Sequence, residues 1–131
     1  ANENDATVSV VDAVKHAVTA TITIPPTEGT PTVPRPMGAV LSPDGSRLYV
    51  TLGRAKSVAV IDVAGRKFVR SIEDVGTRPW GIAISVDGRE LYTANGPSGD
   101  ISVVNIEGDT VEQRITTGGS PWGVVVAAAG R

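Results

Sequence analysis

Apolar residues along this chain occur in short runs, and polar turn residues separate each run from the next. Between residues 36 and 78 the runs lie near 38–42, 47–52, 57–63 and 67–72. They are too short for helices and rich in Val, Ile and Thr, whose branching at Cβ favours extended backbone. Turns recur about every ten residues. The pattern predicts short antiparallel strands joined by tight turns.

The same arrangement of runs and turns occurs more than once. The segment RPMGAVLSPDG at 35–45 reappears as RPWGIAISVDG at 78–88, and a third copy begins as PWGVVV at 121–126. The equivalent prolines stand at 36, 79 and 121, so the copies are 43 and 42 residues apart. A period of about 40–45 residues is typical of a four-stranded β-propeller blade.

This register divides one propeller segment into a partial blade (1–35), two full blades (36–78 and 79–120) and the first strand of a further blade (121–131). We therefore expect an all-β fold, a partial β-propeller of about two and three-quarter antiparallel blades, whereas closed rings have about four to eight. Each repeat buries its apolar faces only against neighbours. Missing blades of the same protein or other copies of the chain are thus expected partners, and the start of the sequence within a blade favours the first.

Acidic and amide residues at the strand ends are predicted to shape turns. Asp44 and Asp87 each precede Gly in a hairpin, where Asp is a common turn residue, and no second acid accompanies them. Asp12, Asp62 and Asn105 end equivalent strands and are expected to hydrogen-bond the following turn. We therefore expect no metal site at these positions.

Composition and charge exclude several classes of function. The net charge is −2 and no stripe of Lys and Arg is present, which argues against nucleic-acid binding. No apolar run approaches the roughly 20 residues of a membrane span. The sequence contains no Cys, no nucleophile elbow, no Walker loop and no paired catalytic carboxylates, and the single histidine, His16, is predicted at an exposed turn. We expect this segment to have no enzymatic activity and no cofactor.

The connections between blades are the candidate ligand site. In a closed propeller they converge near the mouth of the central channel, where Trp offers a flat apolar surface and Arg recognises carboxylate or phosphate. Three variable loops, 3–6, 53–56 and 96–100, are expected on the same face. The candidate residues are Arg35, Met37, Arg78, Trp80, Trp122, Arg54 and Asn95. The alternative is that the repeated Trp and Pro residues set the angle between blades and that the variable loops are tolerant surface.

A proline-rich stretch at 25–34 interrupts the repeat. Equivalent residues are 50 positions apart from Val8 to Val58 but 43 apart from Val58 to Ile101, so the stretch adds seven residues. Four prolines in ten residues favour an extended, semi-rigid loop. This loop is predicted either to contact a partner, such as another protein, or to decorate the surface.

Several elements resemble the YVTN family of propeller repeats, which occur in archaeal surface-layer proteins and in exported bacterial proteins. They are SPDG at 42–45, LYVT at 48–51, RPWG at 78–81 and LYTAN at 91–95, although the signature itself stands as YVTL and YTAN. The ending PWGVVV at 121–126 is similar to that of exported propellers associated with pyrroloquinoline-quinone-dependent catabolism. The resemblance implies a periplasmic or extracellular location, a signal peptide removed upstream, and a recognition function.

The sequence thus predicts a non-enzymatic, exported propeller segment that binds or scaffolds a protein or a small ligand. The alternative is a propeller domain or subunit of a periplasmic quinoprotein-type oxidoreductase. A third hypothesis is a purely structural module of the cell surface.

Overall fold

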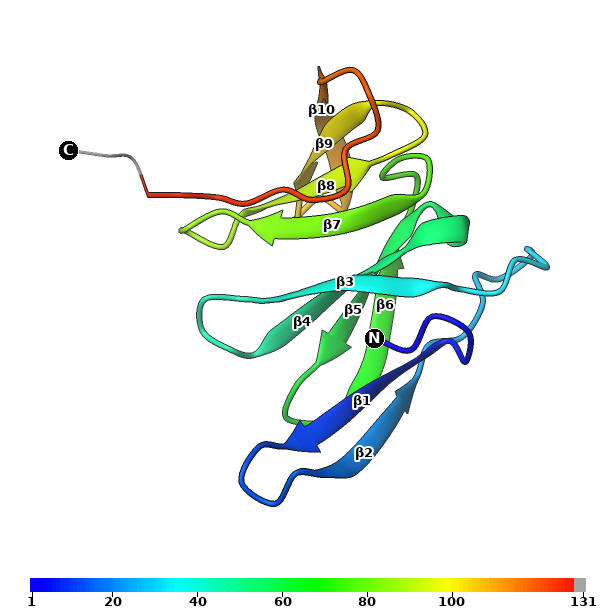
Figure 1. Ribbon diagram of the computed structural model, residues 1–131, viewed down its shortest axis with the longest axis vertical. Helices are drawn as coiled ribbons and strands as arrows, with labels where there is room; N and C mark the ends of the chain where they lie inside the picture. The colour runs from blue at the N-terminus through cyan, green and yellow to red at the C-terminus, as the bar shows by residue number, and fades with distance from the viewer. Residues whose placement is uncertain (129–131) are drawn as a thin grey trace.

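The computed structural model describes residues 1–128, which form ten strands and one short 3₁₀ helix (Figure 1). The elements are β1 (Thr7–Asp12), β2 (Ala17–Thr23), β3 (Pro36–Leu41), β4 (Arg47–Leu52), η1 (Gly53–Ala55), β5 (Ser57–Asp62), β6 (Lys67–Ile72), β7 (Pro79–Ile84), β8 (Glu90–Asn95), β9 (Asp100–Asn105) and β10 (Thr110–Thr116). The strands predicted for the partial blade and for the two full blades lie where the sequence pattern put them, whereas the predicted first strand of a further blade is not formed at 121–128, and 129–131 lie outside the described residues. The short helix η1 was predicted only as a polar loop.

The strands form three antiparallel sheets that follow one another along the chain. The hairpin β1-β2 is followed by the sheet β3-β4-β5-β6 and then by the sheet β7-β8-β9-β10, each in simple meander order. Figure 1 shows them as three stacked layers. This confirms the predicted partial propeller. The arc is open, which implies that missing blades or partner chains complete it.

The core lies between the layers, and β5 shows how the sequence builds it. Val58 and Val60 pack toward β7-β10, whereas Ala59 and Ile61 pack toward the hairpin β1-β2. Successive side chains of a strand point to opposite faces, so a strand covered on both sides is a continuous apolar run. All four residues are fully buried. The middle sheet is therefore stabilised by a neighbouring layer on each face.

The inner strands of adjacent blades approach closely at glycines of the repeat. A Cβ atom at Gly38 of β3 would lie 2.4 Å from the carbonyl oxygen of Trp80 on β7. At Gly81 of β7, it would lie 2.7 Å from the carbonyl oxygen of Trp122. Residues 121–128 thus run beside β7 as β7 runs beside β3 (Figure 1), but they form no strand, since none of the described sheets includes them.

The predicted turn functions of the acidic and amide side chains are confirmed at the ends of β1, β5 and β9. The Asp12 carboxylate accepts hydrogen bonds from the amides of Val14 (2.9 Å) and Lys15 (2.8 Å). The Gly65 amide donates to Asp62 (2.8 Å). Asn105 likewise accepts from the next turn, from the amide of Gly108 at 2.9 Å.

The hairpin between β3 and β4 is fixed by Asp44. Its carboxylate accepts hydrogen bonds from the Ser42 hydroxyl (2.6 Å) and from the Ser46 amide (2.9 Å). These bonds favour the charged form, and that from Ser42 contributes most to lowering the pKa of Asp44 to about 2. The Ser85 hydroxyl lowers the pKa of Asp87 in the next blade in the same way.

One ion pair joins the two full blades. The Arg70 guanidinium on β6 donates from Nε and Nη2 to the two carboxylate oxygens of Asp109, at 2.8 and 2.9 Å. A bidentate pair of this kind is directional as well as attractive, and it raises the pKa of Arg70. It therefore fixes the outer strands of adjacent blades relative to one another.

Candidate ligand-binding site

Two stacked tryptophans lie between the inner strand β7 and the final segment of the chain. The ring centroids of Trp80 and Trp122 are 4.2 Å apart, and the ring planes make an angle of 28°. Trp80 is half-buried, whereas Trp122 is 68% exposed. We call these two residues the tryptophan pair. Its outer ring offers solvent a flat apolar surface of the kind that binds rings and apolar chains.

Glycine residues of the loops between the second and third strands of each blade make room for these side chains. A Cβ atom at Gly96 would lie 2.0 Å from the Trp80 ring, so only glycine fits beneath it. In the preceding blade, a Cβ atom at Gly53 would lie 3.0 Å from Sδ of Met37. Met37 and Trp80 therefore occupy equivalent places, each over the loop of its own blade. This observation supports the architectural function that the sequence left open.

A hollow of about 440 Å³ opens beside the tryptophan pair, and we call it the aromatic hollow. It brings together three candidate residues from three successive inter-blade connections, Met37, Trp80 and Trp122. The carboxylate residue Glu3, from the start of the chain, lines the same hollow. The site is thus mostly apolar with one acidic side chain at its edge.

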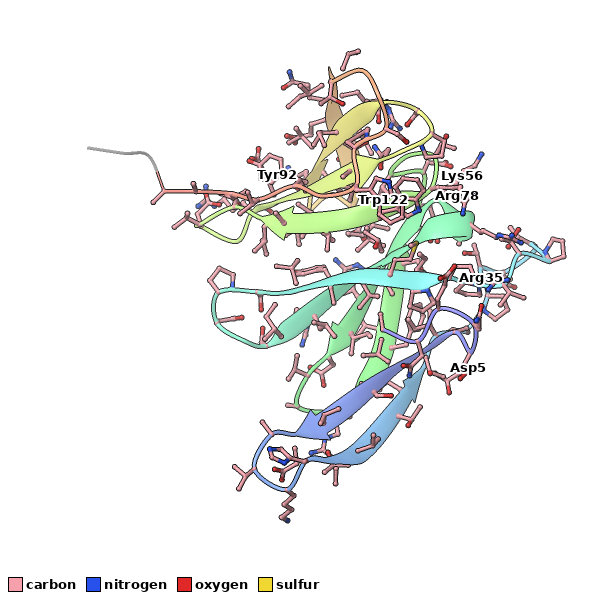
Figure 2. All side chains as sticks on the ribbon, viewed as in Figure 1. Asp5, Arg35, Lys56, Arg78, Tyr92 and Trp122 are labelled. Carbon is pink, nitrogen blue, oxygen red and sulfur yellow. The ribbon has the colours of Figure 1, made fainter. Side chains whose placement is uncertain are left out.

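A second hollow of about 530 Å³ collects the three candidate arginines, and we call it the arginine hollow. It is lined by Pro31, Thr32, Val33, Arg35, Arg54 and Arg78. Figure 2 shows Arg35 and Arg78 at the same end of the blades, which is also the end that carries Lys56. The proline-rich stretch thereby forms one wall of a pocket.

Local backbone geometry places the three guanidinium groups. The Gly53 amide donates to the carbonyl oxygen of Arg35 (2.9 Å), which brings η1, with Arg54, against the end of the proline-rich stretch. Arg78 has a φ of 50°, in the left-handed region, and its Cζ lies 5.8 Å from the centroid of the Trp80 ring. Arg78 of the arginine hollow therefore lies beside Trp80 of the aromatic hollow.

Arg35 is held by a single side-chain partner. Its Nη1 donates to the side-chain oxygen of Asn4, and its Nε is buried without any hydrogen-bond partner. Leaving a buried donor unpaired costs about 1–3 kcal/mol, and more when the group is charged. Arg35 is thus an arginine whose hydrogen-bonding capacity exceeds what its neighbours supply.

Asn95 lines neither hollow. Its side chain is fully buried, donates to Asp100 (2.7 Å) and Ser102 (2.9 Å), and accepts from the Thr93 hydroxyl (3.0 Å). Asn2 donates to Thr7 and Ser9 in the same way in the first blade. These contacts give Asn95 a structural function, and we leave it out of the site.

Sequence reasoning did not find a third hollow of about 300 Å³, where the connection 74–77 meets loops of the two full blades. Its lining includes Asp74, Asp100 and Arg114. Arg114 donates there to the carbonyl oxygens of Asp74 (3.1 Å) and Val75 (3.3 Å) and to Ser102 (2.9 Å). Only the folded contact between blades brings these residues together, so no motif in the sequence identifies them.

His16 and the acidic side chains are the remaining groups that could act in catalysis or bind a metal. His16 lies exposed in the turn between β1 and β2 with a φ of 51°, as the pattern predicted. Residues 1–128 contain no group of three His, Asp or Glu side chains arranged to hold a metal ion. In the same part of the chain, no helix has the length and apolar character needed to cross a membrane.

The chain matches neither a protein-family model nor a curated protein, but it is similar to solved structures. Hydrazine synthase of Kuenenia stuttgartiensis aligns with 92% of this chain and 32% of its own, at a TM-score of 0.77 and 28% identity. AztD of Citrobacter koseri aligns over 99% of this chain and 35% of its own, at 0.69 and 19%. Apo AztD covers 95% and 33%, at 0.68 and 20%.

These structures are β-propellers, which confirms the fold predicted from the repeat. The chain spans about a third of the length of the structures it matches. In these structures, the arc that resembles this chain is therefore one part of a larger propeller. Of these structures, hydrazine synthase is an enzyme by its name and AztD is not named as one, so they do not assign a reaction to this chain.

Proposed function

We propose that this chain is a non-enzymatic β-propeller segment that binds a small ligand or a protein segment at the loop end of its blades. The observation that carries the proposal is the aromatic hollow, where three successive inter-blade connections place Met37, Trp80 and Trp122 around one opening. Aromatic and thioether groups in a concave, solvent-open site bind apolar surfaces of many shapes.

The location we propose is periplasmic or extracellular, and the proposed repeat class is the YVTN type. Both rest on the elements at 42–45, 48–51, 78–81 and 91–95. Completion of the ring by further blades of one protein agrees with the coverage of the structural neighbours. Assembly from several copies is the alternative, and light scattering distinguishes the two because only the second gives a fixed oligomer whose blades complete a ring.

A second candidate function is that of a propeller domain or subunit of an exported oxidoreductase, with a quinoprotein as the type proposed from the sequence. The similarity to hydrazine synthase, at 28% identity over 92% of this chain, favours it. In that case, these blades hold or position a reacting partner whose chemistry is supplied elsewhere. Turnover of a small substrate by the longer protein, lost on substitution in the aromatic hollow, supports this candidate over simple binding.

The test of the leading proposal is a thermal-shift screen of the chain against small aromatic and apolar metabolites, repeated with Trp122→Ala. Because Trp122 is 68% exposed, this variant is expected to keep nearly the melting temperature of the parent chain. Ligands of the aromatic hollow should lose at least tenfold in affinity. Val86→Ala, at an exposed hairpin position, is the control. A screen without a ligand, or ligands unaffected by Trp122→Ala, contradicts the proposal.

A further inference from the structure

We propose that the arginine hollow is an anion-binding site that takes a carboxylate or phosphate group. This proposal deepens the proposed function and rests on it in one respect, because the flat apolar portion of the same ligand lies against the tryptophan pair. The chemical class of ligand is thus an aromatic or otherwise flat molecule with one anionic end.

The first argument is charge that has no counter-charge. Among residues 1–128, none of Arg35, Arg54 and Arg78 forms an ion pair with a carboxylate, although all three line one hollow. By contrast, the arginines on β4 and β6 pair with Asp62 and Asp109. Three cations around one opening repel each other, and an anion placed among them replaces that repulsion with attraction.

The second argument is hydrogen-bonding capacity that the protein does not use. Nε of Arg35 is buried and has no acceptor, while Nη1 is fixed by Asn4. A guanidinium presents donors in a rigid fork that matches the two oxygens of a carboxylate or phosphate. Arg54 and Arg78 are exposed at the rim, so their forks are free to turn toward an anion. Because Nε of Arg35 is covered, the exposed forks of Arg54 and Arg78 are the donors that a ligand in the hollow reaches directly, beside the fixed charge of Arg35.

The third argument is the position of the hollow next to the aromatic site. Arg35 precedes Met37 by two residues and Arg78 precedes Trp80 by two, so each connection supplies both hollows. Cζ of Arg78 lies 5.8 Å from the Trp80 ring centroid. Glu3 lines the aromatic hollow and repels an anion there. This charge pattern orients the ligand, with the anionic end toward the arginines and the ring toward the tryptophans.

The experiment is calorimetric titration of the 131-residue chain with three probes that share a ring: phenylacetate, phenyl phosphate and the neutral phenylacetamide. The variants are Arg54→Gln and Arg78→Gln. The matched control is Arg66→Gln, which removes the same charge from the exposed turn between β5 and β6 and does not line the arginine hollow. Circular dichroism melting verifies that each variant is folded.

We expect at least one of the two anionic probes to bind at least tenfold more tightly than phenylacetamide. Arg54→Gln and Arg78→Gln should each lower its affinity at least tenfold, whereas Arg66→Gln changes it less than twofold. Arg54→Lys keeps the charge without the fork and should retain part of the affinity. Binding of the carboxylate alone or of the phosphate alone also supports the inference and identifies the group that the hollow prefers.

Three results overturn the inference. Equal affinity for all three probes shows that the ring alone is recognised, which leaves the proposed function intact. An equal loss with Arg66→Gln shows attraction by net charge rather than a site. The absence of binding by all three probes refutes the anion site, while the proposed function is then judged separately by the screen with Trp122→Ala.

Discussion

Replacing Asn95 by alanine separates the structural from the ligand-binding interpretation of this residue. The sequence made it a candidate for the site, but its side chain is fully buried and makes three hydrogen bonds, to Thr93, Asp100 and Ser102. The fourth contact is steric, because a Cβ atom at Gly76 would lie 2.3 Å from Cγ of Asn95. Asn95 thus fixes β8, β9 and the connection between the two full blades at once.

The loss in free energy of unfolding caused by Asn95→Ala follows from the hydrogen bonds that each partner of Asn95 loses. Thr93 has no other side-chain partner and is fully buried, so its hydroxyl is left without an acceptor, at a cost of about 1–3 kcal/mol. Ser102 keeps its bonds to Val75 and Arg114, and so loses only the net value of one bond, about 1 kcal/mol. Asp100 keeps the Ser98 hydroxyl and remains accessible to water.

We therefore expect Asn95→Ala to lower the free energy of unfolding by about 3 kcal/mol, or the melting temperature by about 10 °C. Urea unfolding followed by circular dichroism measures the first and thermal melting the second. Asn2→Ala is the matched control, because Asn2 makes the equivalent bonds to Thr7 and Ser9 at a half-buried position. It should lower the free energy by about 1 kcal/mol.

The two interpretations are distinguished by measuring both the stability and the ligand affinity of Asn95→Ala. Below the melting temperature of the variant, the affinity for a ligand of the aromatic hollow should equal that of the parent chain. If Asn95→Ala leaves stability unchanged and weakens ligand binding, the structural interpretation is wrong and Asn95 belongs to the site. Equal losses for Asn95→Ala and Asn2→Ala contradict the argument from burial.

Three further changes test other contacts. Gly96→Ala places a methyl group 2.0 Å from the Trp80 ring, so it should lower the free energy of unfolding by about 2 kcal/mol and change the tryptophan emission. Gly123→Ala is the control, because a methyl group there has no neighbour within 4 Å and should change neither quantity. Asp109→Asn breaks the ion pair between blades and should lower stability by about 1 kcal/mol at low salt, with a smaller loss in urea unfolding at high salt. Ser42→Ala removes the bond that lowers the hairpin pKa most, so NMR titration should show the pKa of Asp44 rising from about 2 toward 3.8. A lowered pKa of Asp44 stabilises the folded chain at every pH above the pKa that this residue has in the unfolded chain. This stabilisation is lost as the pH falls through the pKa of the folded chain, so the variant should lose it at a higher pH.

The fold could be predicted from the sequence because every blade repeats the same local chemistry. The alternation in β5 sends Val58 and Ile61 to opposite faces, and each face meets a layer built by the same pattern. Asp62 and Asn105 fix their turns through bonds to residues three positions away. Contacts that are this local are visible in sequence.

The helix η1 and the third hollow could not be predicted, because both depend on contacts between distant segments. Gly53–Ala55 carries no capping residue, and the Gly53 amide donates to the carbonyl oxygen of Arg35, far earlier in the chain, at 2.9 Å. Arg114 binds carbonyl oxygens of Asp74 and Val75, about 40 residues earlier. Nor does the sequence reveal that Asn95 is buried, since the connection through Gly76 is what covers it.

The open arc affects the two hollows differently. Met37 lies over Gly53 and Trp80 over Gly96, but nothing equivalent lies beneath Trp122 among the described residues. A completing blade that supplied a glycine loop there would cover one face of Trp122 and reshape the aromatic hollow. The arginine hollow does not include Trp122, because its lining comes from the proline-rich stretch and from Arg35, Arg54 and Arg78. A completing blade that reaches only Trp122 should therefore leave the affinity for a small anion unchanged and increase the affinity for the aromatic part of the ligand.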